Sequence, residues 1–369
     1  MEIIEVTNKS LLNLFLDAPG NILKNYPHYI APILSNVKDT LSIKKNPLWQ
    51  VAERKLFVAL KKGKAAGTIA AIYHSQHKQY NPEDAVYFGY LHFENDPGLL
   101  HELVSAVKKF ASEKKVNTLI GPLNPSLNYE LGILTEGFDS DPFFMMNYNP
   151  PYYPALIEKE GGKVAMEFLA YNYRQGIKTD KIERVSGLLK NRYNISIENI
   201  NFKKFEAEAN ELCEVYNDAF KGHFGFIPFS EKEFLFMAKA LKQILNPQLL
   251  FKVKLKGDTA GFMLTIPNIN PAVKQLHKGR LTPWGIIKFI YRLRKIDSAK
   301  VMLVAIRKHY QELGLGSILY NEMNARTKKA GYLQGEISWI AGENNKMQKI
   351  TESIGAKPYK KYVVYRFDV

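Results

Sequence analysis

A glycine-rich run between an apolar strand and a helix could bind a phosphate group. The run reads Gln311-Glu312-Leu313-Gly314-Leu315-Gly316; the apolar stretch 301–306 precedes it, and a helix begins near Ser317. A helix N-terminus leaves backbone N–H groups unpaired, and the helix dipole favours negative charge there. Glycine permits a sharp turn and a close approach of the ligand to the backbone. The run is not a Walker loop, because no Gly-Lys-Ser/Thr follows, and it holds only part of a dinucleotide fingerprint. The alternative is a tight turn without a ligand.

The elements around this run resemble the GNAT superfamily of acyl-CoA N-acyltransferases. Tyr310-Gln311-x-x-Gly314-x-Gly316 is similar to the Q/R-x-x-G-x-G/A loop of that family. Residues 334–340 read as the next strand, and Asn344-x-x-Met347 followed by Gly355-Ala356 resembles the family's N-x-x-A helix and its Gly-Phe ending. The resemblance covers roughly residues 195–369. It implies an α/β fold with a mixed sheet and coenzyme A, as acetyl-CoA, for the acyl donor.

The resemblance also implies which residues hold coenzyme A. Main-chain groups at the end of the strand before the loop would bond the pantetheine, and the loop amides would bond the pyrophosphate. The residues expected at the site are Ala305, Ile306, Gln311, Glu312, Leu313, Gly314, Leu315, Gly316, Ser317 and Asn344. No metal is expected, and the single cysteine, Cys213, excludes a cysteine-rich metal site and a disulfide framework.

The catalytic groups are less clear than the binding loop. An alkylammonium has a pKa of about 10, so the attacking amine needs a base or a desolvating pocket. The strand 301–306 carries no carboxylate, and Thr351 stands where many GNAT members have a thiol-protonating tyrosine. Glu336, on the following strand, is the candidate base, acting directly or through water. The alternative for Glu336 is a surface carboxylate beside Lys328 and Lys329.

Two distant segments indicate that the chain is a duplication. Residues 158–173 and 352–367 share identical residues at a constant offset, and both read as a helix end, a glycine stop and an alternating strand. The matched pairs are Glu158 and Glu352, Gly161 and Gly355, Lys163 and Lys357, and Tyr171 and Tyr365. We therefore predict two tandem GNAT-like domains, 1–178 and 195–369, separated by a charged stretch with a helix over 179–190.

The first copy has no phosphate loop of this kind. At the equivalent place it reads Glu94-Asn95-Asp96-Pro97-Gly98, where two carboxylates would repel a pyrophosphate and Pro97 lacks an N–H. We predict a degenerate first domain that does not bind coenzyme A there. A long loop rich in Gly, Pro and Asn is inserted over 121–154; it is either a turn-stabilised loop or a substrate-facing surface. These segments resemble a bacterial group of two-copy GNAT-like proteins.

A net charge of +15 gives the chain a positive field that suits an acidic ligand, nucleic acid or anionic lipid. Between Asp258 and Asp297 there is no acidic residue, and the segment 284–295 reads as a basic amphipathic helix. This helix is a solvated basic face, a lid over an acidic substrate, or a contact with a membrane surface. A nucleic-acid partner is not expected, because no compact nucleic-acid motif accompanies the charge.

The sequence therefore predicts an acyl-CoA-dependent N-acyltransferase of N-acetyltransferase type, acting on an unknown small-molecule or peptide amine. Two alternatives remain: an aminoacyltransferase that uses charged tRNA, as similar two-copy proteins of peptidoglycan synthesis do, and a non-catalytic protein that binds coenzyme A or another ligand. No signal peptide and no apolar stretch of about 20 residues is visible, so the expected location is the cytoplasm.

Overall fold

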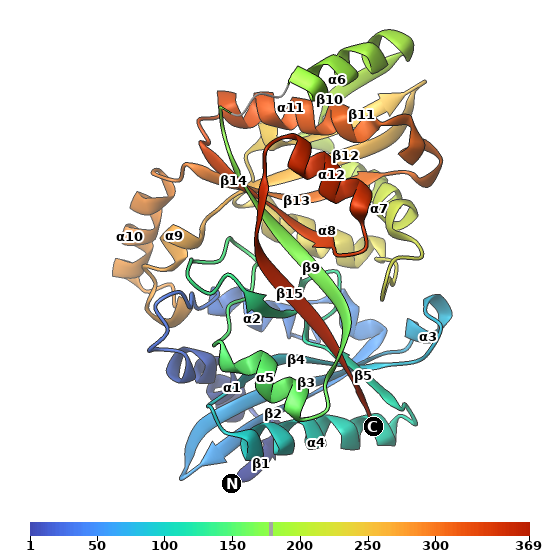
Figure 1. Ribbon diagram of the computed structural model, residues 1–369. Coiled ribbons are helices and arrows are strands. Elements are labelled where there is room, and N and C mark those ends of the chain that lie inside the picture. Colours follow the sequence, from blue (N-terminus) through green and yellow to red (C-terminus); the bar gives the residue numbers. More distant parts are fainter. Residues whose placement is uncertain (177–179) are drawn as a thin grey trace.

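A computed structural model describes residues 1–176 and 180–369, and within them thirteen strands form one mixed sheet (Figure 1). The predicted domain end at 178 and the predicted helix start at 179 lie outside these residues. The strand order is β1-β2-β3-β4-β5-β15-β9-β14-β13-β12-β11-β10, with β8 paired to β15. The mixed α/β fold class predicted from the sequence is confirmed.

The first half supplies one end of the sheet. Its strands in that sheet are β1 (Glu2–Glu5), β2 (Ala52–Lys61), β3 (Lys64–His74), β4 (Val86–Phe93), β5 (Thr118–Gly121), β8 (Ile133–Glu136) and β9 (Lys163–Arg174). The strands β6 (Leu123–Asn124) and β7 (Glu130–Leu131) pair in a separate two-stranded sheet. Its helices are α1 (Lys9–Ile22), α2 (Leu34–Thr40), α3 (His77–Tyr80), α4 (Pro97–Glu113) and α5 (Tyr152–Lys159). The apolar side of α4 packs on β2 to β5 and forms the core of this half.

The second half repeats this plan at the other end of the sheet. Its strands are β10 (Ile195–Asn199), β11 (Leu250–Leu255), β12 (Asp258–Pro267), β13 (Ser298–Ile306), β14 (Gln334–Ala341) and β15 (Lys357–Asp368). Its helices are α6 (Asp180–Arg192), α7 (Phe205–Phe220), α8 (Glu231–Lys242), α9 (Asn270–Val273), α10 (Pro283–Leu293), α11 (Leu315–Lys329) and α12 (Asn345–Ser353). Among the described strands only β4–β5 and β13–β14 run parallel, which places one parallel pair at the same position in each half.

The two halves exchange their last strands. β9 ends the first half but pairs with β14 of the second, whereas β15 ends the second half and pairs with β5 and β8 of the first. The two exchanged strands also pair with each other and cross the middle of the molecule side by side (Figure 1).

The residues that indicated a duplication meet across this exchange. The Tyr171 hydroxyl donates to Glu352 Oε1 at 3.4 Å, and the Tyr365 hydroxyl donates to Glu158 Oε1 at 3.1 Å. Each tyrosine of an exchanged strand therefore bonds the glutamate that closes the helix of the other half. The division into domains 1–178 and 195–369 remains a prediction about the sequence, because in space each half is completed by a strand of the other.

The long loop of the first half is held by side-chain amides. Asn149 Oδ1 accepts from the Leu134 N–H at 2.7 Å, and its Nδ2 donates to the Leu134 carbonyl at 3.1 Å. Asn270 of the second half donates to the Pro142 carbonyl at 2.7 Å. These bonds replace the regular ladder that a loop lacks, and they fix the loop between the two halves.

Candidate active site

The central feature of the second half is a gap between two parallel strands. β13 and β14 pair only from Ser298 with Gln334 to Val301 with Ile337. Beyond Val301, β13 stays paired with β12 on its other side up to Ile306. The edge of 302–306 that faces β14 is therefore free of sheet pairing to that strand. Backbone donors and acceptors on such an edge need other partners, and an extended ligand can supply them.

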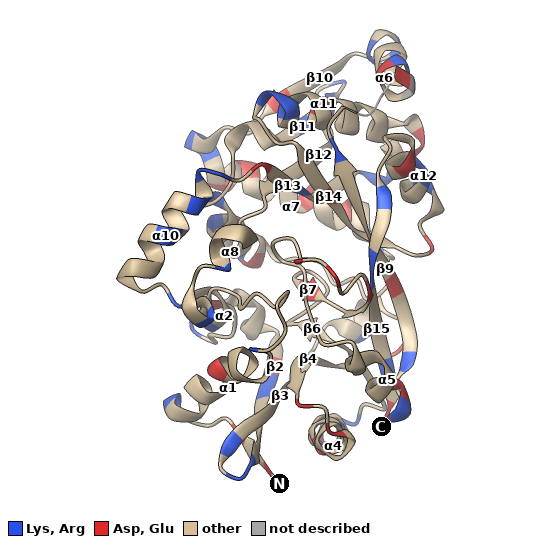
Figure 2. Cartoon of the chain, turned by 60° about the vertical axis from the view of Figure 1, so that its left-hand side comes forward, with Lys and Arg blue, Asp and Glu red and all other residues tan. Residues whose placement is uncertain are grey.

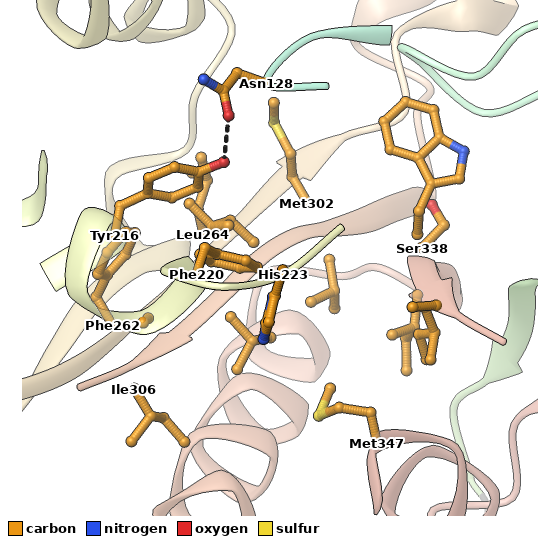
Figure 3. A pocket seen from close by; sticks show the side chains of 18 of the residues that line it. Asn128, Tyr216, Phe220, His223, Phe262, Leu264, Met302, Ile306, Ser338 and Met347 are labelled. Atoms are coloured by element: carbon orange, nitrogen blue, oxygen red, sulfur yellow. Dashed lines mark hydrogen bonds between the residues drawn. The ribbon is translucent and has the colours of Figure 1, made fainter. Parts of the chain in front are cut away.

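A cavity of about 860 Å³ opens at this gap. Its wall includes 302–304 of β13 and 338–341 of β14, together with one side of α7 and α8. The lining is dominated by apolar and aromatic side chains, among them Phe205, Leu212, Phe220, Phe229, Phe234, Met237, Leu241 and Leu245. Figure 3 shows Phe220 together with other apolar side chains of the lining, such as Phe262 and Met302, around the open space. A cavity of this size and character is typical of a site for a small ligand with a long apolar part.

The glycine loop lies at the mouth of the same cavity. Gly314 adopts a left-handed conformation with φ 76° and begins α11 without a side-chain cap. The first turn of α11 therefore keeps backbone donors that an anion can bind. The Gln311 side chain is not directed to a ligand: its Nε2 donates to the Ile306 carbonyl at 3.0 Å and so ties the loop to the end of β13.

The structure brings together many of the residues predicted to hold coenzyme A. Those that line the cavity are Ile306, Gln311, Glu312, Gly314, Gly316 and Asn344. The side chains of Ala305 and Leu315 are buried in the core, and Leu313 and Ser317 are also outside the cavity lining. Asn344 accepts from the Met347 N–H at 3.0 Å and caps α12, so its role is to start that helix beside the loop.

The equivalent helix start in the first half is closed by its own sequence. Asp96 caps α4, and its Oδ1 accepts from the N–H groups of Gly98 at 3.0 Å and Leu99 at 3.3 Å. Lys61 pairs with the same carboxylate at 2.8 Å. The donors that would face a phosphate are already satisfied by a side chain.

Polar groups enter the apolar cavity at a few points. The Tyr216 hydroxyl donates to Asn128 Oδ1 at 2.8 Å, which joins α7 to the long loop of the first half (Figure 3). His223 follows α7, and burial, followed by the charge of Lys308, lowers the pKa of its imidazole. At neutral pH this ring is therefore uncharged.

Lys300 is a charged side chain of β13 that lies almost fully buried in the cavity wall. Its Nζ donates to the carbonyls of Phe144 at 3.3 Å and Met145 at 3.4 Å, and it lies 4.6 Å from the Trp339 ring centre. Burial lowers the pKa of Lys300 to about 8, although the carboxylate of Glu336 acts in the opposite direction. The sequence analysis did not identify Lys300. The only sign of it in the sequence is a single lysine within an apolar strand.

Glu336, the predicted base, is fully buried rather than on the surface beside Lys328 and Lys329. The Ser338 hydroxyl donates to Glu336 Oε1 at 2.6 Å, and the Tyr359 hydroxyl donates to Oε2. Ser338 lines the cavity but Glu336 does not. The carboxylate therefore reaches the cavity through the Ser338 hydroxyl.

Among the described residues, two buried hydroxyls near the loop have no hydrogen-bond partner other than each other. They are Tyr320 Oη on α11 and Thr351 Oγ1 on α12. Tyr320 lines the cavity, and burial raises the pKa of its phenol, so it is a neutral donor. The sequence analysis found no tyrosine at Thr351; the structure places one on the neighbouring helix instead.

The chain resembles two bacterial proteins over nearly its whole length. It is 30% identical to the "Bacterial ceramide synthase" of Caulobacter vibrioides, covering 99% of this chain and 97% of the relative. It is also 30% identical to "Protein YghO" of Escherichia coli, covering 97% and 93%. No family model matches the chain.

Solved structures with the same fold share little sequence. A "Tandem GNAT protein from the clavulanic acid biosynthesis pathway" superposes with a TM-score of 0.58 at 11% identity, covering 100% of this chain and 98% of that one. A "GCN5-related N-Acetyltransferase" of Sphaerobacter thermophilus gives 0.54 at 13% identity, covering 99% and 95%.

The chain has a tandem GNAT fold. It belongs to one family with the two bacterial relatives, and the resemblance to GNAT proteins seen in the sequence is confirmed. Of the two parallel strand pairs among the described strands, only β13–β14 combines the gap with an uncapped helix start.

In residues 1–176 and 180–369, two features are absent. No helix in that part of the chain is both long and apolar enough to cross a bilayer. Nor does it contain a group of three or more His, Cys, Asp or Glu side chains placed to hold a metal ion.

Proposed function

We propose that this tandem GNAT protein is an acyl-CoA-dependent N-acyltransferase that forms an amide on a long-chain amine, in the manner that the name ceramide synthase describes for its relative. The observation that carries the proposal is the apolar cavity joined to the glycine loop. An apolar wall of this extent favours alkyl chains, since each buried methylene contributes about 0.8 kcal/mol. A hydrophilic amine would gain nothing from it.

The donor in this proposal is a long-chain acyl-CoA rather than acetyl-CoA. The loop 311–316 and the start of α11 fit a pyrophosphate, because they offer backbone donors and an uncapped helix end. The free edge of 302–306 fits the amides of a pantetheine arm. The acyl chain and the chain of the acceptor then occupy the apolar space under α7 and α8.

The protein has to remove one proton from the amine and support the leaving thiolate. Glu336 is proposed as the acceptor of the amine proton by way of the Ser338 hydroxyl, which faces the cavity. Lys300 places a positive charge near that carboxylate. The Tyr320 hydroxyl, whose only near partner among the described residues is the Thr351 hydroxyl, is proposed to donate to the thiolate sulfur. The aromatic wall excludes water, which protects the thioester from hydrolysis.

The test is a matrix of donors and acceptors. The purified protein is incubated with acyl-CoA of increasing chain length, and with a long-chain 2-amino alcohol or a short hydrophilic amine. The free coenzyme A thiol is measured with a disulfide reagent, and the amide is identified by mass spectrometry. The single cysteine, Cys213, gives little background, because burial raises the pKa of its thiol to about 12.

The expected result is amide formation only when both substrates carry long chains. Acetyl transfer to a hydrophilic amine would contradict the proposal and support the N-acetyltransferase predicted from the sequence. Turnover that requires charged tRNA would support an aminoacyltransferase, and binding of acyl-CoA without turnover on any acceptor would support a binding protein.

A further inference from the structure

The helix α10 presents large apolar side chains to the outside of the molecule. Trp284 is 77% exposed, Ile287 59% and Tyr291 57%, and Leu281, Ile286 and Ile290 are also exposed. Isolated apolar residues on a surface are ordinary, but a contiguous group on one short helix indicates an interaction site.

The helix is nevertheless firmly placed on the protein. Its inner side carries Gly285, Phe289 and Leu293, and the last two pack on a cluster that includes Val273 and Leu276. Thr282 caps its start by accepting from the Gly285 N–H at 3.2 Å. The exposed apolar side chains are thus the outward face of an ordered helix.

The helical repeat groups three of these outward residues into one stripe. At 100° per residue, Trp284, Ile287 and Tyr291 fall within about 60° of one another, and Lys288 lies beside them. Arg292, Arg294 and Lys295 continue the charge at the end of the helix. Figure 2 shows α10 at the edge of the molecule with basic residues and no acidic ones along it.

The charge of this helix is uncompensated. Within the described part of the chain, Lys288, Arg292, Arg294 and Lys295 form no ion pair, and none of them is buried. The neighbouring bases behave differently: Lys274 pairs with Asp141 at 2.7 Å, and Arg280 pairs with Asp17 at 2.5 Å. Lys274 and Arg280, which precede the helix, therefore fix it to the first half. The bases on and just after the helix are free of acidic partners among the described residues, and Lys295 lies 4.4 Å from the Tyr291 ring centre.

We propose that α10 lies on the surface of an anionic lipid bilayer, with its apolar stripe among the headgroups and its basic residues on the lipid phosphates. Trp and Tyr beside Lys and Arg on one exposed helix are the composition of an interfacial helix. Nucleic acid would use the bases but not the apolar stripe. The inference stands without the proposed reaction, because it rests on this helix alone.

The helix is also close to the cavity. Ile244 follows α8 and packs in the same cluster as Phe289, while Leu241 and Leu245 beside it line the cavity. A bilayer under α10 would therefore lie on the side of the molecule where α8 covers the apolar site.

The experiment is flotation of the full chain with vesicles. Vesicles contain either phosphatidylcholine alone or phosphatidylcholine mixed with phosphatidylglycerol. The wild-type protein is expected to float with the anionic vesicles and not with the neutral ones. Raising the salt from 0.1 M to 1 M, which shortens the screening length from about 10 Å to about 3 Å, should weaken the charge contribution.

Two pairs of variants separate the contributions. Trp284→Ala with Ile287→Ser removes the stripe, and Lys288→Glu with Arg292→Glu reverses the charge; each should lower binding to anionic vesicles at least about 10-fold. The matched controls are Ile43→Ser, an exposed isoleucine elsewhere, and Lys62→Glu with Lys64→Glu at the β2–β3 turn. Both controls should float as the wild type does.

Three outcomes would overturn the inference: no binding of the wild type to anionic vesicles, unchanged binding of either α10 variant, or an equal loss in the controls. None of these measurements involves turnover. Membrane binding by an inactive protein would count against the proposed reaction only, and activity without membrane binding would count against the role of α10 only.

Discussion

A few residues decide the chemistry of this site, and the sequence located some of them better than others. Gly314 was identified from its place in the Gln-x-x-Gly-x-Gly motif. The turn before α11 has a left-handed backbone conformation at this residue, and glycine adopts that conformation without steric cost. Glu336 was named as a base, but its burial and its bond from Ser338 could not be read from the chain. Lys300 was missed. A lysine inside an apolar strand does not reveal from the local sequence that its side chain is buried in the wall of a cavity.

Glu336→Gln is expected to lower kcat by about 100-fold or more, since general-base catalysis contributes on the order of 10² to 10⁴. Glutamine keeps an oxygen that accepts from Ser338, and its amide N–H can donate to the Tyr359 hydroxyl, so the fold and coenzyme A affinity should be retained. Steady-state kinetics and calorimetry measure the two effects. A kcat near that of the wild type would remove Glu336 from the reaction, and a lost affinity would assign it to structure.

Gly314→Asp is expected to abolish binding of coenzyme A, because a negative side chain enters the place of the pyrophosphate. Gly314→Asn is the charge control, with nearly the same shape and tolerance of a left-handed backbone. Gly331→Asp is the strain control, because Gly331 also has a positive φ, 83°, and nothing near its missing side chain. By calorimetry, Gly331→Asp should bind coenzyme A most tightly, Gly314→Asn less tightly and Gly314→Asp least tightly. Equal affinities would refute the loop assignment.

Glu233→Gln is expected to stabilise the protein in a pH-dependent way. Burial raises the pKa of Glu233 to about 7, so the folded protein binds this proton more tightly than the unfolded chain does. The stability that comes from this tighter proton binding is fully present below the unfolded pKa of 4.5. It is lost as the pH rises through the folded pKa of about 7. At pH 8 the variant should be more stable by up to about 3 kcal/mol, since one pKa unit corresponds to about 1.4 kcal/mol.

The Tyr129 hydroxyl donates to Glu233 Oε1 at 3.1 Å, and the glutamine oxygen can accept the same bond. The difference from the wild type should therefore vanish near pH 4.5. Denaturant unfolding at both pH values measures it. A difference that does not change with pH would show that Glu233 titrates normally.

At the scale of elements, the two equivalent helix starts, of α4 and α11, differ in one residue type. α11 begins with Gly314 and has no side-chain cap, whereas α4 begins with Asp96, which occupies its own N–H groups. The sequence could predict this difference, because capping depends on local residues. It could not predict that α7 and α8 cover the gap between β13 and β14, because that contact joins segments far apart in the chain.

Ala238→Phe is expected to shorten the apolar space under α8 and thus the chain that fits. Ala238 lines the cavity, and excluding two or three methylenes at about 0.8 kcal/mol each lowers kcat/KM for long chains about 10-fold or more. Short substrates should be unaffected. Ala240→Phe, on the exposed side of the same helix, is the control. Kinetics over a series of acyl-CoA and amine lengths measure the shift, and an unchanged length preference would place the chains elsewhere.

At the scale of the whole molecule, the strand exchange is what local patterns could not reveal. The alternation of apolar and polar residues in β9 and β15 would be the same whether each strand paired within its own half or with the other half. Such a pattern shows which side chains of a strand face the core, but it does not show which strand is the neighbour. The matched tyrosines and glutamates pointed to duplication, but only the fold shows that each pair forms between halves.

The exchange predicts that the halves do not fold alone. A fragment of residues 1–176 would lose β15, whose Tyr365 and Phe367 fill the core under α4, and a fragment of 180–369 would lose β9 beside β14. Each would leave an unpaired central strand and exposed apolar surface, which favours aggregation. Expressed separately, the fragments should show no cooperative unfolding by circular dichroism. Expressed together, they should co-purify as a one-to-one complex, because all strand pairs can form without a covalent link across 177–179. A monomeric, cooperatively folded 180–369 fragment that binds coenzyme A would show that the second half is complete without β9.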